Sequence, residues 1–236
     1  MDKLQEALIW ISTANIDDLR NIDTLSYWIG HAGLFFDSRK SPHDPLVSIY
    51  GDDVKYMLDS TGKGMWQTPC QLSPFLITLS YKNIKTYLDI GTLTGWTITF
   101  IAAYLKRFGL EAVDAIDIDQ FCNSETQDIW QQFEIPINYI VCKSSDIEKN
   151  ISDMYDFIFI DGNHEYANVK EDFQRYGQRT CMMAFHDIND HFCTGVVRLW
   201  NEIKLVYRST YSFTEFIDHP NKYMLMGIGL VEKPYF

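Results

Sequence analysis

The sequence predicts an α/β fold in which seven mostly parallel strands form a doubly wound sheet. From about residue 80 onward, short apolar runs alternate with helical patterns, which is typical of a parallel sheet with helices on both faces. Before residue 80 the apolar residues recur only at helical spacing, and the last two apolar runs have no helical pattern between them. We therefore expect a helical N-terminal segment, and a sheet closed by an antiparallel C-terminal strand pair.

The N-terminal segment, residues 1–80, is expected to form a cap within the same compact unit as residues 81–236. Four apolar residues near the start recur at helical spacing: Leu4, Ala7, Leu8 and Ile11. A second helix is expected at 26–34, and a third at 69–81, where Pro69 suits a first helical turn. Residues 37–45 are polar and contain two prolines, which is typical of a surface loop.

Residues 81–236 show the alternation that defines a Rossmann-like sheet. Five apolar runs are expected to be buried parallel strands: 84–90, 112–118, 137–141, 157–160 and 181–185. Three segments between or after them have helical periodicity: 94–108, 166–176 and 196–206. The runs 211–217 and 223–231 are expected to form the antiparallel pair. Ligands of such folds bind at the carboxyl ends of the strands, so residues just after each run are the functional candidates.

Charge and cysteine content limit the classes of partner and location. The chain carries 20 Lys and Arg against 32 Asp and Glu, a formal net charge of -12, and we find no basic patch, so no nucleic-acid partner is expected. The five cysteines are scattered and never spaced as CxxC, which favours reduced thiols in the cytoplasm. Neither a signal-peptide pattern nor a long apolar span is visible, so no membrane association is expected.

A glycine turn follows the first predicted strand. The residues Asp89-Ile90-Gly91-Thr92-Leu93-Thr94-Gly95 form a D-x-G-x-x-x-G pattern that leads into a helix, and glycines there let the backbone turn sharply and approach a ligand closely. The dinucleotide fingerprint G-x-G-x-x-G would need glycine where Leu93 stands, which disfavours a pyrophosphate cradle. An ordinary strand-to-helix turn remains the alternative interpretation.

Two further strand ends carry polar groups suited to a nucleoside. Asp117 ends the second run, where a carboxylate can accept both hydrogen bonds from a ribose diol. The alternative is a solvated acid or a helix N-cap, a role that Asp119 fits better. After the third run, Ser145 and Asp146 could reach an adenine edge, or could equally cap the following helix.

The fourth and fifth strand ends each carry an acid and a histidine. Asp161 and His164 follow the fourth run, and His186 and Asp187 end the fifth. Each pair is suited to acid–base chemistry or to metal binding. Isolated surface pairs of this kind are common, but adjacent strand ends meet in space, so the two pairs are expected to form one functional cluster.

These residues resemble the class I S-adenosylmethionine-dependent methyltransferases. The Asp89–Gly95 turn is similar to their first motif, and Asp117 to their ribose-binding acid. Three segments are similar to methyltransferase family 24, which borders on the macrolide-sugar and catechol-type O-methyltransferases: GMWQTP at 64–69, FIDGNHEY at 159–166, and FHDI at 185–188, the last followed by Gly195-Val196-Val197 and Trp200. The resemblance covers residues 62 to 231.

The resemblance implies S-adenosylmethionine as the cofactor. This molecule has a sulfonium, an ammonium and a ribose but no phosphate, so carboxylates and backbone carbonyls suit its pocket. The expected cofactor-binding residues are Gln67, Asp89, Gly91, Thr92, Gly95, Asp117, Ser145, Asp146 and Asp161.

The resemblance also bears on the catalytic residues. In the metal-dependent relatives three oxygen ligands hold Mg²⁺ at the fourth and fifth strand ends, and Asp161 and Asp187 match two of these positions. The third is His186, a poorer ligand for a hard cation, so a metal-free site in which His164 alone removes the acceptor proton is the alternative. We predict that His164, Asp161 and His186 are catalytic, with His164 as the general base and His186, oriented by Asp187, as its rival.

The predicted function is methyl transfer to a small polar molecule, with O-methylation of a hydroxyl as the leading hypothesis and N-methylation left open. One alternative is an NAD-dependent oxidoreductase or sugar-nucleotide enzyme, which the Leu93 position disfavours. The other is a catalytically silent cofactor-binding module. The sequence does not identify the molecule that accepts the methyl group. It also leaves open the oligomeric state, and a homo-oligomer is possible.

Overall fold

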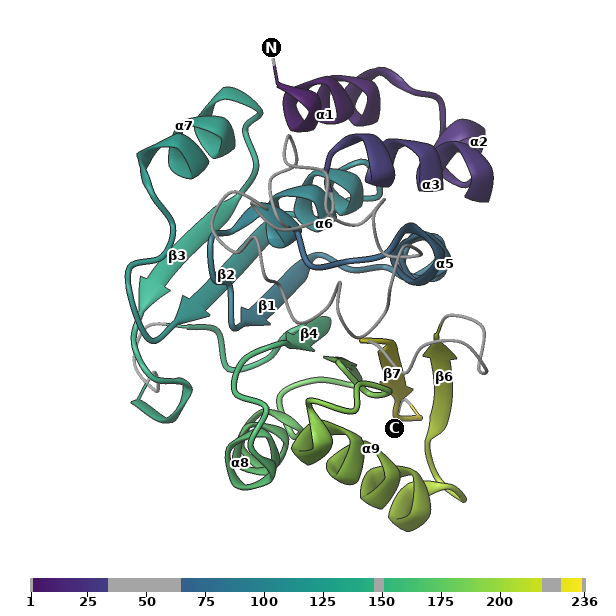
Figure 1. Ribbon diagram of the computed structural model, residues 1–236, viewed down its shortest axis with the longest axis vertical. Coiled ribbons are helices and arrows are strands. Elements are labelled where there is room, and N and C mark those ends of the chain that lie inside the picture. The colour runs from purple at the N-terminus through teal and green to yellow at the C-terminus, as the bar shows by residue number, and fades with distance from the viewer. Residues whose placement is uncertain (1, 34–64, 147–150, 218–225, 235–236) are drawn as a thin grey trace.

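The computed structural model, which describes residues 2–33, 65–146, 151–217 and 226–234, contains a seven-stranded sheet with helices on both faces (Figure 1). The strand order is β3-β2-β1-β4-β5-β7-β6. The strands are β1 (Thr86–Ile90), β2 (Ala112–Asp117), β3 (Ile137–Val141), β4 (Phe157–Ile160), β5 (Met182–His186), β6 (Ser212–Phe216) and β7 (Ile228–Glu232). The first five pair in parallel, while β7 pairs antiparallel with both β5 and β6. The predicted fold class is confirmed.

The central strands are largely apolar because both of their faces are covered. In β4, Phe157 and Phe159 point into one buried cluster, and Ile158 and Ile160 point into the other. Successive side chains of a strand alternate between faces, so a strand with helices on both sides becomes a continuous apolar run. This is why runs without polar alternation predicted these strands so closely.

One face of the sheet is covered by α6 (Trp96–Lys106) and α7 (Ser124–Gln132) together with N-terminal helices (Figure 1). These are α1 (Lys3–Thr13), α2 (Ile16–Leu19), α3 (Ile22–His31) and α5 (Pro69–Leu79). The buried stripe of α1 consists of the four residues expected from their spacing. The Arg107 guanidinium donates to backbone carbonyls of Ile11 and Ala14, and thereby ties the end of α6 to the end of α1.

The opposite face is covered by α8 (Tyr166–Tyr176) and α9 (Thr194–Tyr207) (Figure 1). Their buried residues, among them Val169 and Trp200, pack in one cluster with the alternate side chains of the strands. Within the described residues, no helix combines the length and apolar character that a membrane crossing requires.

Several boundaries differ from the prediction, and local capping explains them. The helix expected at 26–34 begins at Ile22, because the Asn21 side chain accepts a hydrogen bond from the Thr24 amide and caps it. The helix α7 was not expected, since only a narrow stripe of this polar segment is buried. Residues 34, 37–45, 64 and 223–225 of the predicted elements and motifs lie outside the described residues.

Close backbone contact brings the ends of β1 and β4 together. Gly91 follows β1 with a φ of +94°, and a Cβ at this position would lie 2.2 Å from the carbonyl oxygen of Asp161. The Asp161 amide donates to the Ile90 carbonyl at 2.8 Å. Only glycine fits so close an approach, and as a result the glycine turn and the acid after β4 border the same space.

Candidate active site

A cavity of about 890 Å³ opens at the carboxyl ends of β1, β2, β4 and β5. Its volume lies in the range of ligand sites, about 300 to 1,000 Å³. Most of the residues expected from the sequence line it: Asp89, Gly91, Thr92, Asp117, Ser145, Asp161, His164, His186 and Asp187. The structure therefore gathers the nucleoside candidates and the acid–histidine cluster around one space.

Three predicted cofactor residues do not line this cavity. Gln67 is completely buried, and neither polar atom of its side-chain amide has a hydrogen-bond partner within the described residues. Gly95 is the N-cap of α6 and has a φ of +84°. Asp146 is exposed in the 3₁₀ turn Ser144–Asp146 and accepts a hydrogen bond from Ser145. Their positions give no support to direct cofactor contact, and for Asp146 they favour the local role.

Asp117 both faces the cavity and holds the glycine turn in place. Its Oδ2 atom accepts from the Leu93 amide at 2.6 Å, and its Oδ1 atom accepts from the Ile118 amide at 2.7 Å. The helix that follows is capped by Asn123 instead, so the N-cap interpretation of Asp117 is wrong. Each carboxylate oxygen has a second lone pair, so Asp117 can still accept hydrogen bonds from a ligand.

Asp89 lies buried beneath the turn. Tyr87 Oη donates to its Oδ1 atom at 2.5 Å, and Thr92 Oγ1 donates to its Oδ2 atom at 2.9 Å. Burial raises the pKa of the Asp89 carboxyl to about 7, although both hydrogen bonds favour the charged form. A cation bound in the cavity would therefore stabilise the carboxylate, because it offsets the loss of solvation.

The acid–histidine cluster joins the ends of β4 and β5 by crossed pairs. His164 Nε2 lies 3.0 Å from Asp187 Oδ2. His186 Nδ1 lies 3.1 Å from Asp161 Oδ1 and 3.2 Å from Asp187 Oδ1. The expected convergence of the two pairs is present. The partners differ from the expectation, however, because Asp187 and not Asp161 contacts His164.

Burial and charge act against each other in this cluster. Burial opposes the charged form of His186, but Asp161 and Asp187 outweigh it and hold the pKa of the imidazole well above its usual value. Burial raises the pKa of the Asp161 carboxyl. The hydrogen bond with Asp187 raises the pKa of His164, whose side chain is 47% exposed.

The donor set matches Mg²⁺ poorly. Asp161, His186 and Asp187 offer ligand atoms within 4.8 Å of one another. One of the three is an imidazole nitrogen that already lies at hydrogen-bond distance from both carboxylates, whereas Mg²⁺ selects oxygen ligands in octahedral geometry. This arrangement favours the metal-free alternative and makes His186 the partner of the two acids. The Mg²⁺ ligands Asp161 and Asp187 stay a prediction.

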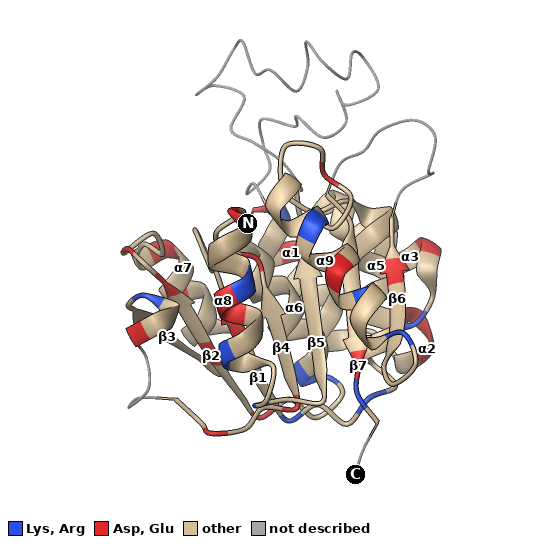
Figure 2. Cartoon of the chain, turned by 90° about the horizontal axis from the view of Figure 1, so that it is seen from below, with Lys and Arg blue, Asp and Glu red and all other residues tan. Residues whose placement is uncertain are grey.

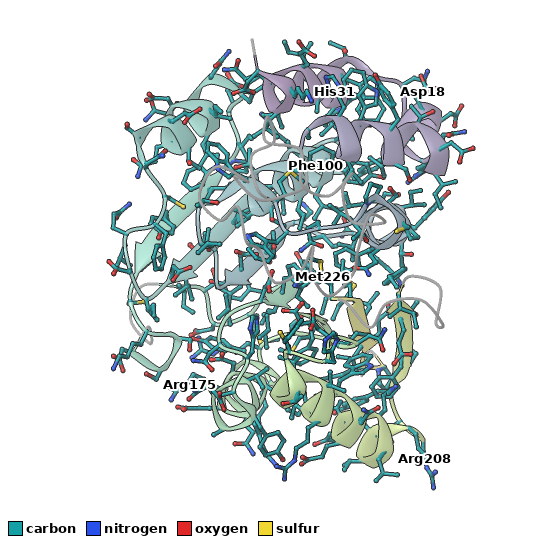
Figure 3. The ribbon with its side chains drawn as sticks, viewed as in Figure 1. Asp18, His31, Phe100, Arg175, Arg208 and Met226 are labelled. Carbon is teal, nitrogen blue, oxygen red and sulfur yellow. The ribbon has the colours of Figure 1, made fainter. Side chains whose placement is uncertain are left out.

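The structure adds residues that the sequence argument missed. Cys193 lies beside His164 and Asp187, and burial raises the pKa of its thiol. Asp190 anchors the loop between β5 and α9, because its carboxylate accepts from the amides of Phe192 and Met226 at 2.8 and 2.9 Å. Met226, labelled in Figure 3, borders the cavity together with Phe192. Only a short polar stretch before a helix marked this loop in the sequence.

Residues 88–188 match a methyltransferase domain of the family Methyltransf_24. No curated protein matches the chain at a significant level. Among solved structures, the O-methyltransferase TomG from Streptomyces achromogenes, involved in tomaymycin synthesis and solved with S-adenosylmethionine, has a TM-score of 0.56 at 14% identity, covering 84% of this chain and 96% of its own.

Two other similar structures carry different descriptions. An rRNA methylase from Streptococcus thermophilus has a TM-score of 0.54 at 13% identity, covering 70% of this chain and 97% of its own. A protein from Klebsiella pneumoniae, provisionally assigned as an O-methyltransferase, has a TM-score of 0.52 at 15% identity, covering 96% of this chain and 94% of its own. At such identities the likeness shows the fold alone. The chain resembles the class I methyltransferases of family 24 and their O-methyltransferase neighbours in domain and fold.

Proposed function

We propose that this chain is an S-adenosylmethionine-dependent methyltransferase that methylates a hydroxyl of a small polar molecule. One observation carries the proposal: a single cavity is bordered by Asp117 and the glycine turn at one end and by the His164–Asp187 pair at the other. A nucleoside cofactor and a base that serves a second molecule would then share one enclosed space. Such placement converts a bimolecular transfer into a reaction between aligned partners.

The β1–β2 side of the cavity suits the cofactor. Asp117 would accept from the two ribose hydroxyls, Gly91 would allow the backbone to approach the ligand, and Asp89 would balance the positive charge of the cofactor. The sulfonium and ammonium groups of S-adenosylmethionine complement these carboxylates. An NAD-type pyrophosphate would instead meet the acidic turn without the glycine that its fingerprint requires.

The β4–β5 side suits the acceptor, with His164 as the general base. If its Nε2–H donates to Asp187, the lone pair of Nδ1 is left to take a proton. As the acceptor oxygen attacks the methyl carbon, the O–C bond forms and the S–C bond breaks, so the electron pair stays on sulfur. The hydroxyl proton passes to His164 Nδ1, and the products are the methyl ether and S-adenosylhomocysteine.

His186 is the competing base. Its Nδ1 atom is engaged by two carboxylates, and its Nε2 atom has no hydrogen-bond partner within the described residues. It is only 4% exposed, whereas His164 is more open to the cavity. We therefore assign proton removal to His164, with His186 stabilising the two acids.

A small acceptor is favoured over RNA by the charge of the chain. In the view of Figure 2, the Lys and Arg of the described residues are interspersed among Asp and Glu, and within this part of the chain they form no continuous basic band. Because the protein carries a net charge of -12, most of its surface would repel an RNA backbone. The proposal includes a cytoplasmic location, residues 1–80 as a cap on a cofactor-binding unit at 81–236, and no fixed oligomeric state.

Calorimetric titration with S-adenosylhomocysteine and with NAD tests the cofactor. We expect saturable binding of the first and none of the second, and the reverse result would refute the assignment. Turnover of S-adenosylmethionine against a panel of hydroxylated metabolites and a structured RNA then tests the acceptor. Methylation of RNA alone would overturn the small-molecule proposal, and tight cofactor binding without turnover of any acceptor would favour a silent module.

A further inference from the structure

The loop between β5 and α9 brings a thiol to the His164–Asp187 pair. A ring nitrogen of His164, a carboxylate oxygen of Asp187 and the Sγ atom of Cys193 lie within 4.8 Å of one another. His164 Nε2 and Asp187 Oδ2 are 3.0 Å apart. Asp187 and Cys193 are buried while His164 is partly exposed, so the three groups form one wall that an ion can reach from the cavity.

Close backbone packing holds these residues together. A Cβ on Gly195 would lie 2.2 Å from the His164 carbonyl oxygen and 2.4 Å from the Tyr166 amide nitrogen. The start of α9 can therefore contact the segment after β4 only because residue 195 lacks a side chain. This contact fixes Cys193 beside His164. Asp187 has a φ of +62°, a conformation that non-glycine residues adopt at a cost of about 1 to 3 kcal/mol, typically at functional sites.

The chemistry of the three groups selects one class of ion. Thiolate and imidazole are ligands of borderline-soft metals, whereas Mg²⁺ and Ca²⁺ take oxygen ligands. We propose that His164, Asp187 and Cys193 form a binding site for a divalent ion of the Zn²⁺ class, with a fourth coordination position open to the cavity. Three protein ligands with one open position is the arrangement of zinc sites that keep access to solvent or substrate.

The distances between the three ligand atoms allow a tetrahedral metal site to form with small movements of the side chains. Zinc lies about 2.0 to 2.3 Å from nitrogen, oxygen and sulfur ligands, so the ligands of a tetrahedral site are about 3.3 to 3.8 Å apart. Mutual distances within 4.8 Å thus need shifts of about 1 Å. On binding, the Cys193 thiol loses its proton to solvent as the sulfur–metal bond forms. The His164 ring changes tautomer through solvent, so that its proton moves from Nε2 to Nδ1 and the Nε2 lone pair binds the metal in place of the hydrogen bond to Asp187.

Metal binding would have a consequence for catalysis, and this consequence rests on the proposed function. When Nε2 of His164 binds the metal, the proton of the neutral ring stands on Nδ1. That nitrogen then has no lone pair for the acceptor proton, so the metal-bound form lacks its general base. The metal site itself does not depend on this argument.

Cobalt titration of the full-length protein tests the site directly, with Co²⁺ as the spectroscopic substitute for Zn²⁺. After removal of metal by chelation, one equivalent of Co²⁺ should produce a thiolate-to-cobalt charge-transfer band in the near ultraviolet and the visible bands of four-coordinate cobalt. Zn²⁺ should abolish both. Mg²⁺ in large excess should leave them unchanged.

Three variants assign the ligands. Cys193→Ser should eliminate the charge-transfer band, and His164→Ala should weaken Co²⁺ binding more than the about 10- to 100-fold typical of lost outer-shell partners. Cys142→Ser is the matched control, because Cys142 is another thiol that borders the same cavity at the β3 end. It should leave the spectrum unchanged.

Two spectroscopic results would overturn the proposal: Co²⁺ binding without a thiolate band, or a band that is lost in Cys142→Ser and kept in Cys193→Ser. Absence of saturable Co²⁺ binding would equally refute it. Thermal unfolding of the same samples reports the integrity of the fold. Calorimetric titration with S-adenosylhomocysteine reports cofactor binding. It also separates the two proposals, because the cofactor can bind whether or not the metal does.

Discussion

Replacing Asp117 with asparagine tests the cofactor assignment most directly. The carboxylate accepts from the amides of Leu93 and Ile118, so truncation to alanine would leave two backbone donors without partners and would disturb the glycine turn itself. Asparagine has the same shape but lacks the charge and keeps one acceptor oxygen, so it retains one of the two backbone contacts whereas alanine loses both. Asp117→Asn therefore separates the loss of ribose binding from collapse of the turn better than Asp117→Ala does.

The expected magnitude follows from the number of hydrogen bonds. A hydrogen bond to a charged group contributes about 1.5 to 3 kcal/mol, and about 1.4 kcal/mol corresponds to a tenfold change in affinity. If the asparagine variant loses the hydrogen bond from one of the two ribose hydroxyls, its affinity for S-adenosylhomocysteine falls by about 10- to 150-fold. Loss of both hydrogen bonds to the ribose would lower the affinity further than the loss of one.

The assay is calorimetric titration of S-adenosylhomocysteine into the wild type and the variant. Asp119→Asn is the matched control, because it removes a carboxylate two residues further on that lies outside the residues bordering the cavity. Thermal unfolding of both variants reports the integrity of the turn. Unchanged affinity in Asp117→Asn, with an unchanged melting temperature, would refute the ribose assignment.

Three further predictions concern the base, the turn and the buried acid. His164→Ala should lower the methyl-transfer rate by about 10²- to 10⁴-fold with cofactor affinity nearly unchanged, and activity lost in His186→Ala but kept in His164→Ala would transfer the role to His186. Gly91→Ala should lower the free energy of unfolding in urea by several kcal/mol, because its Cβ would lie 2.2 Å from a carbonyl oxygen. Gly109→Ala, which has a φ of +103° but nothing within 4 Å, should cost only about 1 to 2 kcal/mol, and equal losses at the two positions would contradict the close approach. Because the pKa of Asp89 is raised to about 7, its carboxylate forms as pH rises through 7, so affinity for the S-adenosylmethionine cation should increase between about pH 6 and 8. Asp89→Asn should flatten this dependence, and an identical slope in the variant would assign the effect to another group.

Local patterns in the sequence determined the sheet and the identity of most residues around the cavity. Buried parallel strands are apolar on both faces, so the run at 157–160 coincides with β4. The run at 137–141 coincides with β3, although the expectation of a buried strand is wrong there, because β3 is an edge strand without a buried residue. Parallel strands end at one edge, and this is why Asp117, Asp161 and His186 could be placed around a common site before their geometry was known.

The pairing within the site was decided only by tertiary structure. His164 contacts Asp187 from the neighbouring strand end, although Asp161 is three residues away along the chain. Cys193 enters the cluster because Gly195 allows α9 to approach the segment after β4. Such contacts depend on how closely two distant backbones approach, and no periodicity or turn signal in either segment encodes that distance.

The same distinction applies to two expected cofactor-binding residues that do not border the cavity. Gln67 and Asp146 were predicted from their positions in motif-like segments. In the structure Gln67 is completely buried and Asp146 is exposed. Sequence periodicity determines which face of an element is buried, because it follows from the repeat of a helix or strand. Which side chains then meet across two elements depends on the packing of the whole chain, and only the folded structure decides it.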